Sequence, residues 1–146
     1  MTIFNKILVA YDGSPHSKKA IEKAAEFLAV ESRIEAHIVN VIQPPHVEVH
    51  RVYGVNLSQD LYQEMLEVSQ KTIEEARELL AEYEDACHFK QLNGKAYQEI
   101  LNYAEENEID LIILGSRGLG AIKGMLLGSV SQNVVQHASC DVLVVK

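Results

Sequence analysis

The residues best suited to chemistry in this sequence lie between Gly115 and Ser131. Five of the eight glycines fall in this stretch, at positions 115, 118, 120, 124 and 128, and Ser129 and Ser131 follow them. Glycine lets main-chain N–H groups approach a phosphate closely. The first turn of a helix adds unpaired N–H donors and a partial positive charge. The pattern therefore predicts an anion-binding loop that leads into a helix capped by Ser129, with the hydroxyls of Ser129 and Ser131 as further donors.

The distribution of charge supports an anionic ligand. The chain has a formal net charge of −8, yet no Asp or Glu occurs from Leu111 through Cys140, where Arg117 and Lys123 are present. This segment is locally positive within an acidic chain. Because the chain as a whole is acidic, it repels nucleic acid, and we expect no nucleic-acid partner.

The elements that must position this loop alternate between strands and helices. Short apolar runs predict strands, and apolar residues at helical spacing predict helices. The expected strands span 6–11, 34–42, 87–92, 110–114 and 141–145, and the expected helices span 15–30, 58–84 and 97–107, with a last one from 129. Ser14 and Pro15 favour the cap and first position of the first helix. The alternation predicts one α/β domain over residues 1–146, an open parallel sheet with helices on both faces.

Ligands of such sheets bind at the carboxyl ends of the strands. Asp12 and Gly13 follow the first strand, and Gly115 to Gly118 follow the fourth. No window matches the P-loop pattern. Gly118, Gly120 and Gly124 depart from the dinucleotide fingerprint, which belongs after the first strand of its unit and has glycine where this chain has Lys123.

A different pattern does match. The spacing Gly115-x2-Gly118-x9-Gly128-Ser129 resembles the ATP-binding signature of the universal stress protein family. The resemblance extends in order over the whole chain, through 6–14, 39–41, Gly94 and 140–145. It implies five parallel strands in the order 3-2-1-4-5, an adenine nucleotide alpha hydrolase-like fold. Ala10 stands where the family often has proline, a change that leaves the site open.

The resemblance also implies a nucleotide site for ATP, or for AMP or ADP. Asp12 would lie near the ribose or, indirectly, near Mg²⁺ on the phosphates, and main-chain groups of Val41 would hold the adenine. The implied ligand-binding residues are Ala10, Asp12, Val41, Leu114, Gly115, Arg117, Gly118, Gly128, Ser129, Val130 and Ser131. From the residues alone, Asp12 is equally explained as a turn former, and Arg117 as a solvated loop charge. The family likeness further implies a homodimer joined through Val142–Val145.

These observations favour a cytoplasmic nucleotide-binding regulator of the stress response over an enzyme. Asp12 is the one acid in the strand-end segments assigned to the site, so at most slow ATP hydrolysis is expected. The alternatives are an ATPase or nucleotidyl-transfer enzyme on the same fold, and an interaction protein that binds no nucleotide. No apolar run approaches the ~20 residues that span a membrane, so no membrane partner is expected. Cys87 and Cys140 are expected as buried thiols, and a metal site at His46 and His50 is not favoured.

Overall fold

The structure is a computed structural model that describes residues 3–44, 55–120 and 123–146, with no side chains described at 55–58. His46 and His50 fall outside these residues, so the expectation that they do not form a metal site stays a prediction.

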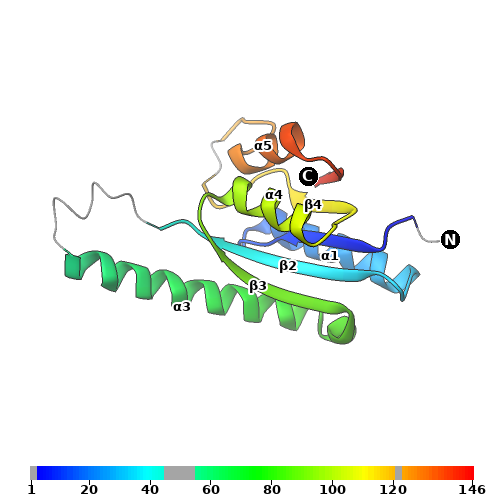
Figure 1. Cartoon of the computed structure of the whole chain (residues 1–146), viewed down its shortest axis with the longest axis horizontal. Helices are drawn as coiled ribbons and strands as arrows, with labels where there is room; N and C mark the ends of the chain where they lie inside the picture. The colour runs from blue at the N-terminus through cyan, green and yellow to red at the C-terminus, as the bar shows by residue number, and fades with distance from the viewer. Residues whose placement is uncertain (1–2, 45–54, 121–122) are drawn as a thin grey trace.

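Five parallel strands form one sheet, as the sequence predicts (Figure 1). The strand order is β3-β2-β1-β4-β5, which confirms the expected topology. The strands are β1 (Lys6–Ala10), β2 (Glu35–Ile42), β3 (Cys87–Asn93), β4 (Leu111–Gly115) and β5 (Asp141–Val145). The register places Leu8 beside His37 and His37 beside His88. Side chains alternate between the two faces of a strand, so these paired residues point to the same face of the sheet.

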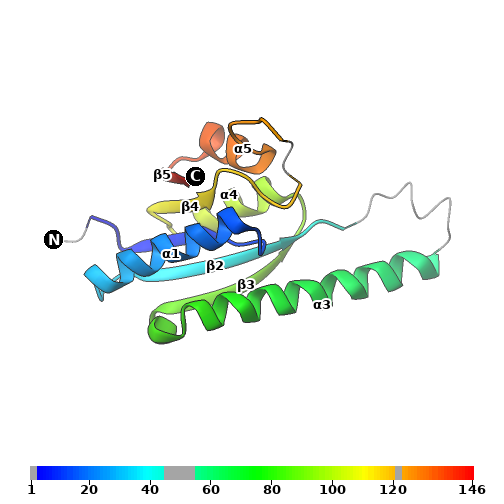
Figure 2. The same cartoon turned by 180° about the vertical axis from the view of Figure 1, so that it is seen from behind.

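Helices cover both faces of the sheet, and Figures 1 and 2 show the two layers from opposite sides. The helices α1 (Pro15–Val30) and α3 (Val55–Leu79) pack on one face, and α4 (Ala96–Glu106) and α5 (Ser129–His137) pack on the other. Ser14 caps α1, with its hydroxyl oxygen accepting from the Ser17 N–H at 3.3 Å, and Pro15 is the first helical residue. Within the described ranges, no helix combines the length and apolar content needed to cross a bilayer.

The long helix has other bounds than the expected 58–84. The observed helix α3 begins at Val55 and ends at Leu79, and a short 3-10 helix, η1 (Ala81–Ala86), follows it. The backbone leaves α-helical geometry at Leu80, whose side chain is fully buried, and again at Tyr83. Leu80 packs in the core at the junction of α3 and η1, and η1 leads the chain into β3.

Two apolar clusters fill the spaces between the sheet and its helical layers. Ile7 and Val9 pack towards α1 and α3, whereas Leu8 and Ile112 pack towards α4 and α5. All four side chains are fully buried. The sheet is therefore apolar on both faces, which explains why its central strands read as continuous apolar runs. The order of the strands reverses between β1 and β4, and their carboxyl ends meet there.

Candidate functional site

A cavity of about 490 Å³ lies at the carboxyl ends of β1, β2 and β4, beside the first turns of α4 and α5. We call it the crevice. Every residue that the family resemblance assigned to a ligand site lines it, although those residues come from separate segments of the chain. They are Ala10, Asp12, Val41, Leu114, Gly115, Arg117, Gly118, Gly128, Ser129, Val130 and Ser131.

The glycine-rich stretch predicted to bind an anion contributes further lining residues, Leu119, Gly120 and Met125. Outside that stretch, the lining residues not assigned to the site from the sequence are Tyr11, Ser17, Val39, Gln43, Ala96 and Ile100. Val39 could have been found, because it is two residues from Val41 and so shares its face of β2. Ala96 and Ile100 could not, because the helical periodicity of α4 does not say which of its turns overlies the sheet.

Asp12 ties the turn after β1 to the glycine-rich loop. Its Oδ1 accepts from the main-chain N–H of Ser14 at 2.9 Å, and its Oδ2 accepts from the N–H of Leu119 at 3.1 Å. The first contact is an Asx-type turn, which gives Asp12 the turn-forming role that the sequence allows. The second contact brings the carboxylate to the crevice wall. Both roles are compatible, since each carboxylate oxygen has a further lone pair.

Two glycines allow close approaches that a side chain would prevent. A Cβ at Gly115 would lie 2.7 Å from the main-chain carbonyl carbon of His16, and one at Gly118 would lie 2.6 Å from Asp12 Oδ2. At Gly128 the nearest atom would be 3.5 Å away, which is an ordinary contact. Glycine at 115 is therefore required by the packing of β4 on α1, and glycine at 118 by the position of Asp12.

The N-terminus of α5 opens into the crevice. Gly128, not Ser129, is the N-cap: its backbone is extended, with φ −73° and ψ 169°, and its carbonyl accepts from Gln132 N–H at 3.0 Å. The expectation that Ser129 caps the helix is therefore wrong, and Ser129 is the first helical residue. Gly128 has no side chain to satisfy the helical amides. The first-turn N–H groups of Ser129, Val130 and Ser131 therefore lack intrahelical acceptors at the crevice wall.

Ser131 links the two ends of the glycine-rich loop through its hydroxyl. Its buried hydroxyl lies 2.9 Å from the carbonyl oxygen of Ser116 and 3.1 Å from that of Gly128. Gly128 N–H also donates to the Ser116 carbonyl at 2.7 Å. A hydroxyl has one hydrogen, so in this arrangement the Ser131 hydroxyl is occupied by the main chain. The exposed Ser129 hydroxyl is the better placed of the two for a ligand.

The electrostatics of the crevice favour an anion at the α5 end. Asp12 is the one acid among the described lining residues, and Arg117 is the one cation. Arg117 is half-buried and forms no ion pair within the described part of the chain, whereas Lys123 is exposed and lies outside the lining. Burial, followed by the Glu75 and Asp12 carboxylates, raises the pKa of Tyr11. Its phenol therefore stays neutral and is a poor base.

Part of the crevice wall is apolar. Val39, Val41, Ile100 and Leu114 form it, and Gln43 lies at its rim, where the Gln43 Oε1 accepts from the first amide of α4 at 3.0 Å. The crevice thus joins an apolar slot to a cluster of N–H donors. Such a site suits a ligand with a flat apolar part and an anionic part.

Comparison with known proteins finds universal stress proteins both by sequence and by structure. The profile of the Universal stress protein family matches residues 3–146. The universal stress protein YxiE of Bacillus subtilis is 38% identical, over 99% of this chain and 100% of its own length. The solved structure of the protein MJ0577 superposes with a TM-score of 0.80 at 28% identity, covering 99% of this chain and 97% of that one.

Two further solved structures contain nucleotides. A universal stress protein in complex with cAMP has a TM-score of 0.69 and 24% identity, covering 99% of this chain and 98% of its own. One from Archaeoglobus fulgidus in complex with dAMP has a TM-score of 0.71 and 19% identity, covering 99% and 100%. At these identities the likeness establishes a common fold.

Proposed function

This chain belongs to the universal stress protein family, and we propose that its crevice binds an adenine nucleotide, with ATP as the ligand. The observation that carries the proposal is the junction of an apolar slot with the first amides of α5, which have no intrahelical acceptor and no side-chain cap. The slot fits a purine ring, and the amides fit phosphate. We propose that the nucleotide acts as a regulatory ligand in a stress-response protein.

The lining residues suggest how the nucleotide lies. The adenine would pack against Val39 and Ile100, with main-chain groups of Val41 at its edge. The phosphates would lie against Gly118, the α5 amides and the Ser129 hydroxyl. Relatives of this fold that bind cAMP and dAMP make an adenine nucleotide the first ligand to test here.

Asp12 and Arg117 would act at the phosphate end. The Asp12 carboxylate would contact the ribose or a Mg²⁺ ion on the phosphates, since carboxylate oxygen suits that ion. The Arg117 guanidinium would pair with a phosphate, because it lines the crevice without an ion-pair partner among the described residues. Charge-assisted contacts of this kind contribute about 1.5–3 kcal/mol.

The test is calorimetric titration with ATP and Mg²⁺ of the wild type and of two matched variants. We expect Arg117→Ala to weaken ATP binding by about 10- to 100-fold, the equivalent of that contact. Lys123→Ala removes a cation from the same loop but outside the crevice, and we expect little change. Equal losses of ATP affinity in both variants would mean that Arg117 contributes only to the overall positive potential of the loop and makes no direct contact with a phosphate. No heat and no thermal shift at millimolar ATP would exclude nucleotide binding and favour an interaction protein without a ligand.

We propose that hydrolysis is slow or absent. The described lining offers one carboxylate, Asp12, both of whose oxygens already accept N–H groups, and no histidine or lysine. Fast phosphoryl transfer needs a metal clamp and a positioned nucleophile as well as a phosphate cradle. Release of phosphate from ATP should therefore stay far below the ~1 per second of ordinary enzymes. Turnover at or above that rate would support the alternative of an ATPase or nucleotidyl-transfer enzyme.

We also propose a homodimer joined along β5. This strand is at the edge of the sheet and pairs only with β4 among the described strands. Its residues Val142, Leu143, Val144 and Val145 are half-buried in one chain. An apolar edge strand with open main-chain groups favours pairing with a second copy.

A further inference from the structure

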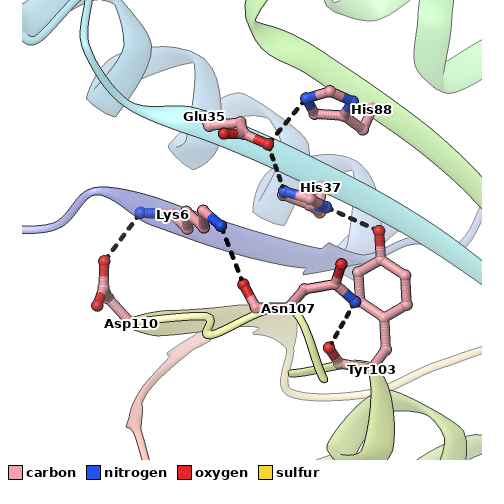
Figure 3. Close-up of polar contacts among 7 residues, drawn as sticks. All are labelled: Lys6, Glu35, His37, His88, Tyr103, Asn107 and Asp110. Atoms are coloured by element: carbon pink, nitrogen blue, oxygen red, sulfur yellow. Dashed lines mark hydrogen bonds and ion pairs between the residues drawn. The ribbon is translucent and has the colours of Figure 1, made fainter. Parts of the chain in front are cut away.

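A second cluster of chemically active side chains lies away from the crevice, towards the start of β2. Glu35 and His37 are two residues apart on β2, so they share a face of the sheet. His88 is the register partner of His37 on β3 and shares that face. Figure 3 shows the three side chains directed towards one another. We call them the Glu35–His37–His88 cluster.

Its geometry is compact. Glu35 Oε1 lies 2.9 Å from Nε2 of His37 and 2.9 Å from Nε2 of His88. One ligand atom from each of the three residues falls within 4.8 Å of the others. The two imidazole rings are stacked, with centroids 4.8 Å apart and planes 28° from parallel. A single carboxylate oxygen of Glu35 therefore lies within hydrogen-bonding distance of the Nε2 atoms of both imidazoles.

We propose that the Glu35–His37–His88 cluster binds a divalent transition-metal ion of the zinc type. Zinc accepts imidazole nitrogen and carboxylate oxygen at about 2.0–2.2 Å, so its tetrahedral ligand atoms lie about 3.4 Å apart. The observed separations are close enough to reach that spacing by small side-chain rotations. Three protein ligands leave a fourth position for water, which is the composition of an open zinc site. Imidazole ligands favour zinc, copper or nickel over magnesium or calcium.

The surroundings hold His37 in the orientation that a ligand needs. His37 Nδ1 lies 2.7 Å from the hydroxyl of Tyr103, a residue of α4, and both side chains are buried. Metal ligation at Nε2 requires the proton on Nδ1, and the Tyr103 oxygen can accept it. The nearby cation Lys6 is turned to the main-chain oxygen of Asn107, at 3.4 Å (Figure 3).

The cluster is open to a metal ion from solvent. The side chain of His88 is 53% exposed and that of Glu35 is 39% exposed, whereas His37 is 7% exposed. The ion would therefore bind at the rim of the sheet with His37 as its inner ligand. Val39, the crevice-lining residue of β2 nearest to His37, lies two residues further on, about 7 Å along the strand. None of the three cluster residues lines the crevice, so the two sites are neighbouring but distinct.

The experiment is a titration of the nucleotide-free, untagged chain with Zn²⁺ in competition with a chromophoric chelator. We expect one Zn²⁺ per chain with a micromolar or lower Kd. His88→Ala removes an exposed ligand and should weaken binding at least tenfold, because losing even an outer partner costs about 10- to 100-fold. His137→Ala is the matched control, since His137 is an exposed histidine on α5, outside the cluster.

Two further measurements distinguish a specific zinc site from non-specific zinc binding. Tyr103→Phe keeps every ligand but removes the partner of His37 Nδ1, and we expect it to weaken binding by about 10- to 100-fold. Zinc-edge X-ray absorption should show two imidazole nitrogens, a signal that does not depend on how a variant folds. Unchanged affinity in His88→Ala, or no zinc binding by the wild type at a hundredfold excess of metal, would overturn the proposal.

Discussion

Two glycines allow the chain to pack closely at the strand ends. Gly115 lies against the main chain of His16 at the start of α1, where the neighbouring atoms cannot rotate away. Gly118 lies against the Asp12 carboxylate, which can move only by giving up its bond to Leu119. A substitution at Gly115 should therefore lower the stability of the fold, whereas one at Gly118 should change the geometry of the crevice.

We predict that Gly115→Ala lowers the free energy of unfolding by about 1–3 kcal/mol, the usual range for overpacking. Gly120→Ala serves as the control, because a Cβ there would meet nothing within 4 Å. Urea unfolding followed by circular dichroism measures both. Equal stability of the two variants would contradict the close approach at Gly115.

Cys87 and Cys140 are half-buried, not fully buried as expected from the sequence, and they should still react slowly. Burial, followed by the charge of Glu84, raises the pKa of Cys87 to about 11, and burial also raises that of Cys140. Because the thiolate is the nucleophile, a raised pKa lowers the reactive fraction at pH 8. We expect labelling by iodoacetamide to be much slower in the native chain than in urea. Native labelling at the rate of a free thiol would contradict the raised pKa values of the two thiols.

At the scale of the elements, β5 presents one main-chain edge to β4 and the other to the outside. The carbonyl of Val145 accepts from Ser116 N–H at 2.8 Å, so Val145 faces β4. Main-chain groups alternate in direction along a strand, so those of Leu143 face β4 too, and those of Val142 and Val144 face outwards. The outward pair is available for the proposed second copy.

We predict that Val144→Pro yields a monomer while keeping the fold. Proline at 144 removes an outward N–H and leaves the ladder to β4 in place. Val144→Ala shortens the side chain but retains the N–H, and should remain dimeric. Sedimentation equilibrium distinguishes the two states. A dimeric Val144→Pro chain would place the contact between copies elsewhere.

At the scale of the molecule, the crevice joins parts of the chain that pack on different sides of the sheet. The turn after β1, the first turn of α4 and the loop before α5 all contribute to its walls. A ligand that contacts all three binds only the folded chain. It therefore stabilises the fold by about 2.7 kcal/mol at a concentration of a hundred times Kd.

We predict a rise in Tm with increasing ATP, measured by differential scanning calorimetry. Tripolyphosphate is the control, since it carries the anionic part of ATP without the base. We expect a smaller rise with it, because the apolar wall of Val39 and Ile100 stays uncovered. Equal rises would mean that the crevice recognises only the phosphates. Gly118→Ala, which displaces Asp12, should reduce the response to ATP.

Much of the fold follows from local patterns. The strand runs, the cap at Ser14 and the first position of Pro15 depend on neighbouring residues, and each was predicted. Errors occurred where tertiary contacts choose between local options. The long helix ends at Leu79 and not at the expected Glu84, and the backbone of the buried Leu80 departs from α-helical geometry. The cap of α5 moved to Gly128, whose N–H bonds to the Ser116 carbonyl across the loop.

The sequence by itself determined the order of strands and helices along the chain, the glycines that let the loop approach the strand ends, and the absence of acidic residues from the segment that contains them. Those properties depend on residue type and spacing along the chain. Only the tertiary structure decided that Ile100 faces the crevice and that His88 meets His37 and Glu35. The physical reason is that helix placement and strand register are set by packing between distant segments.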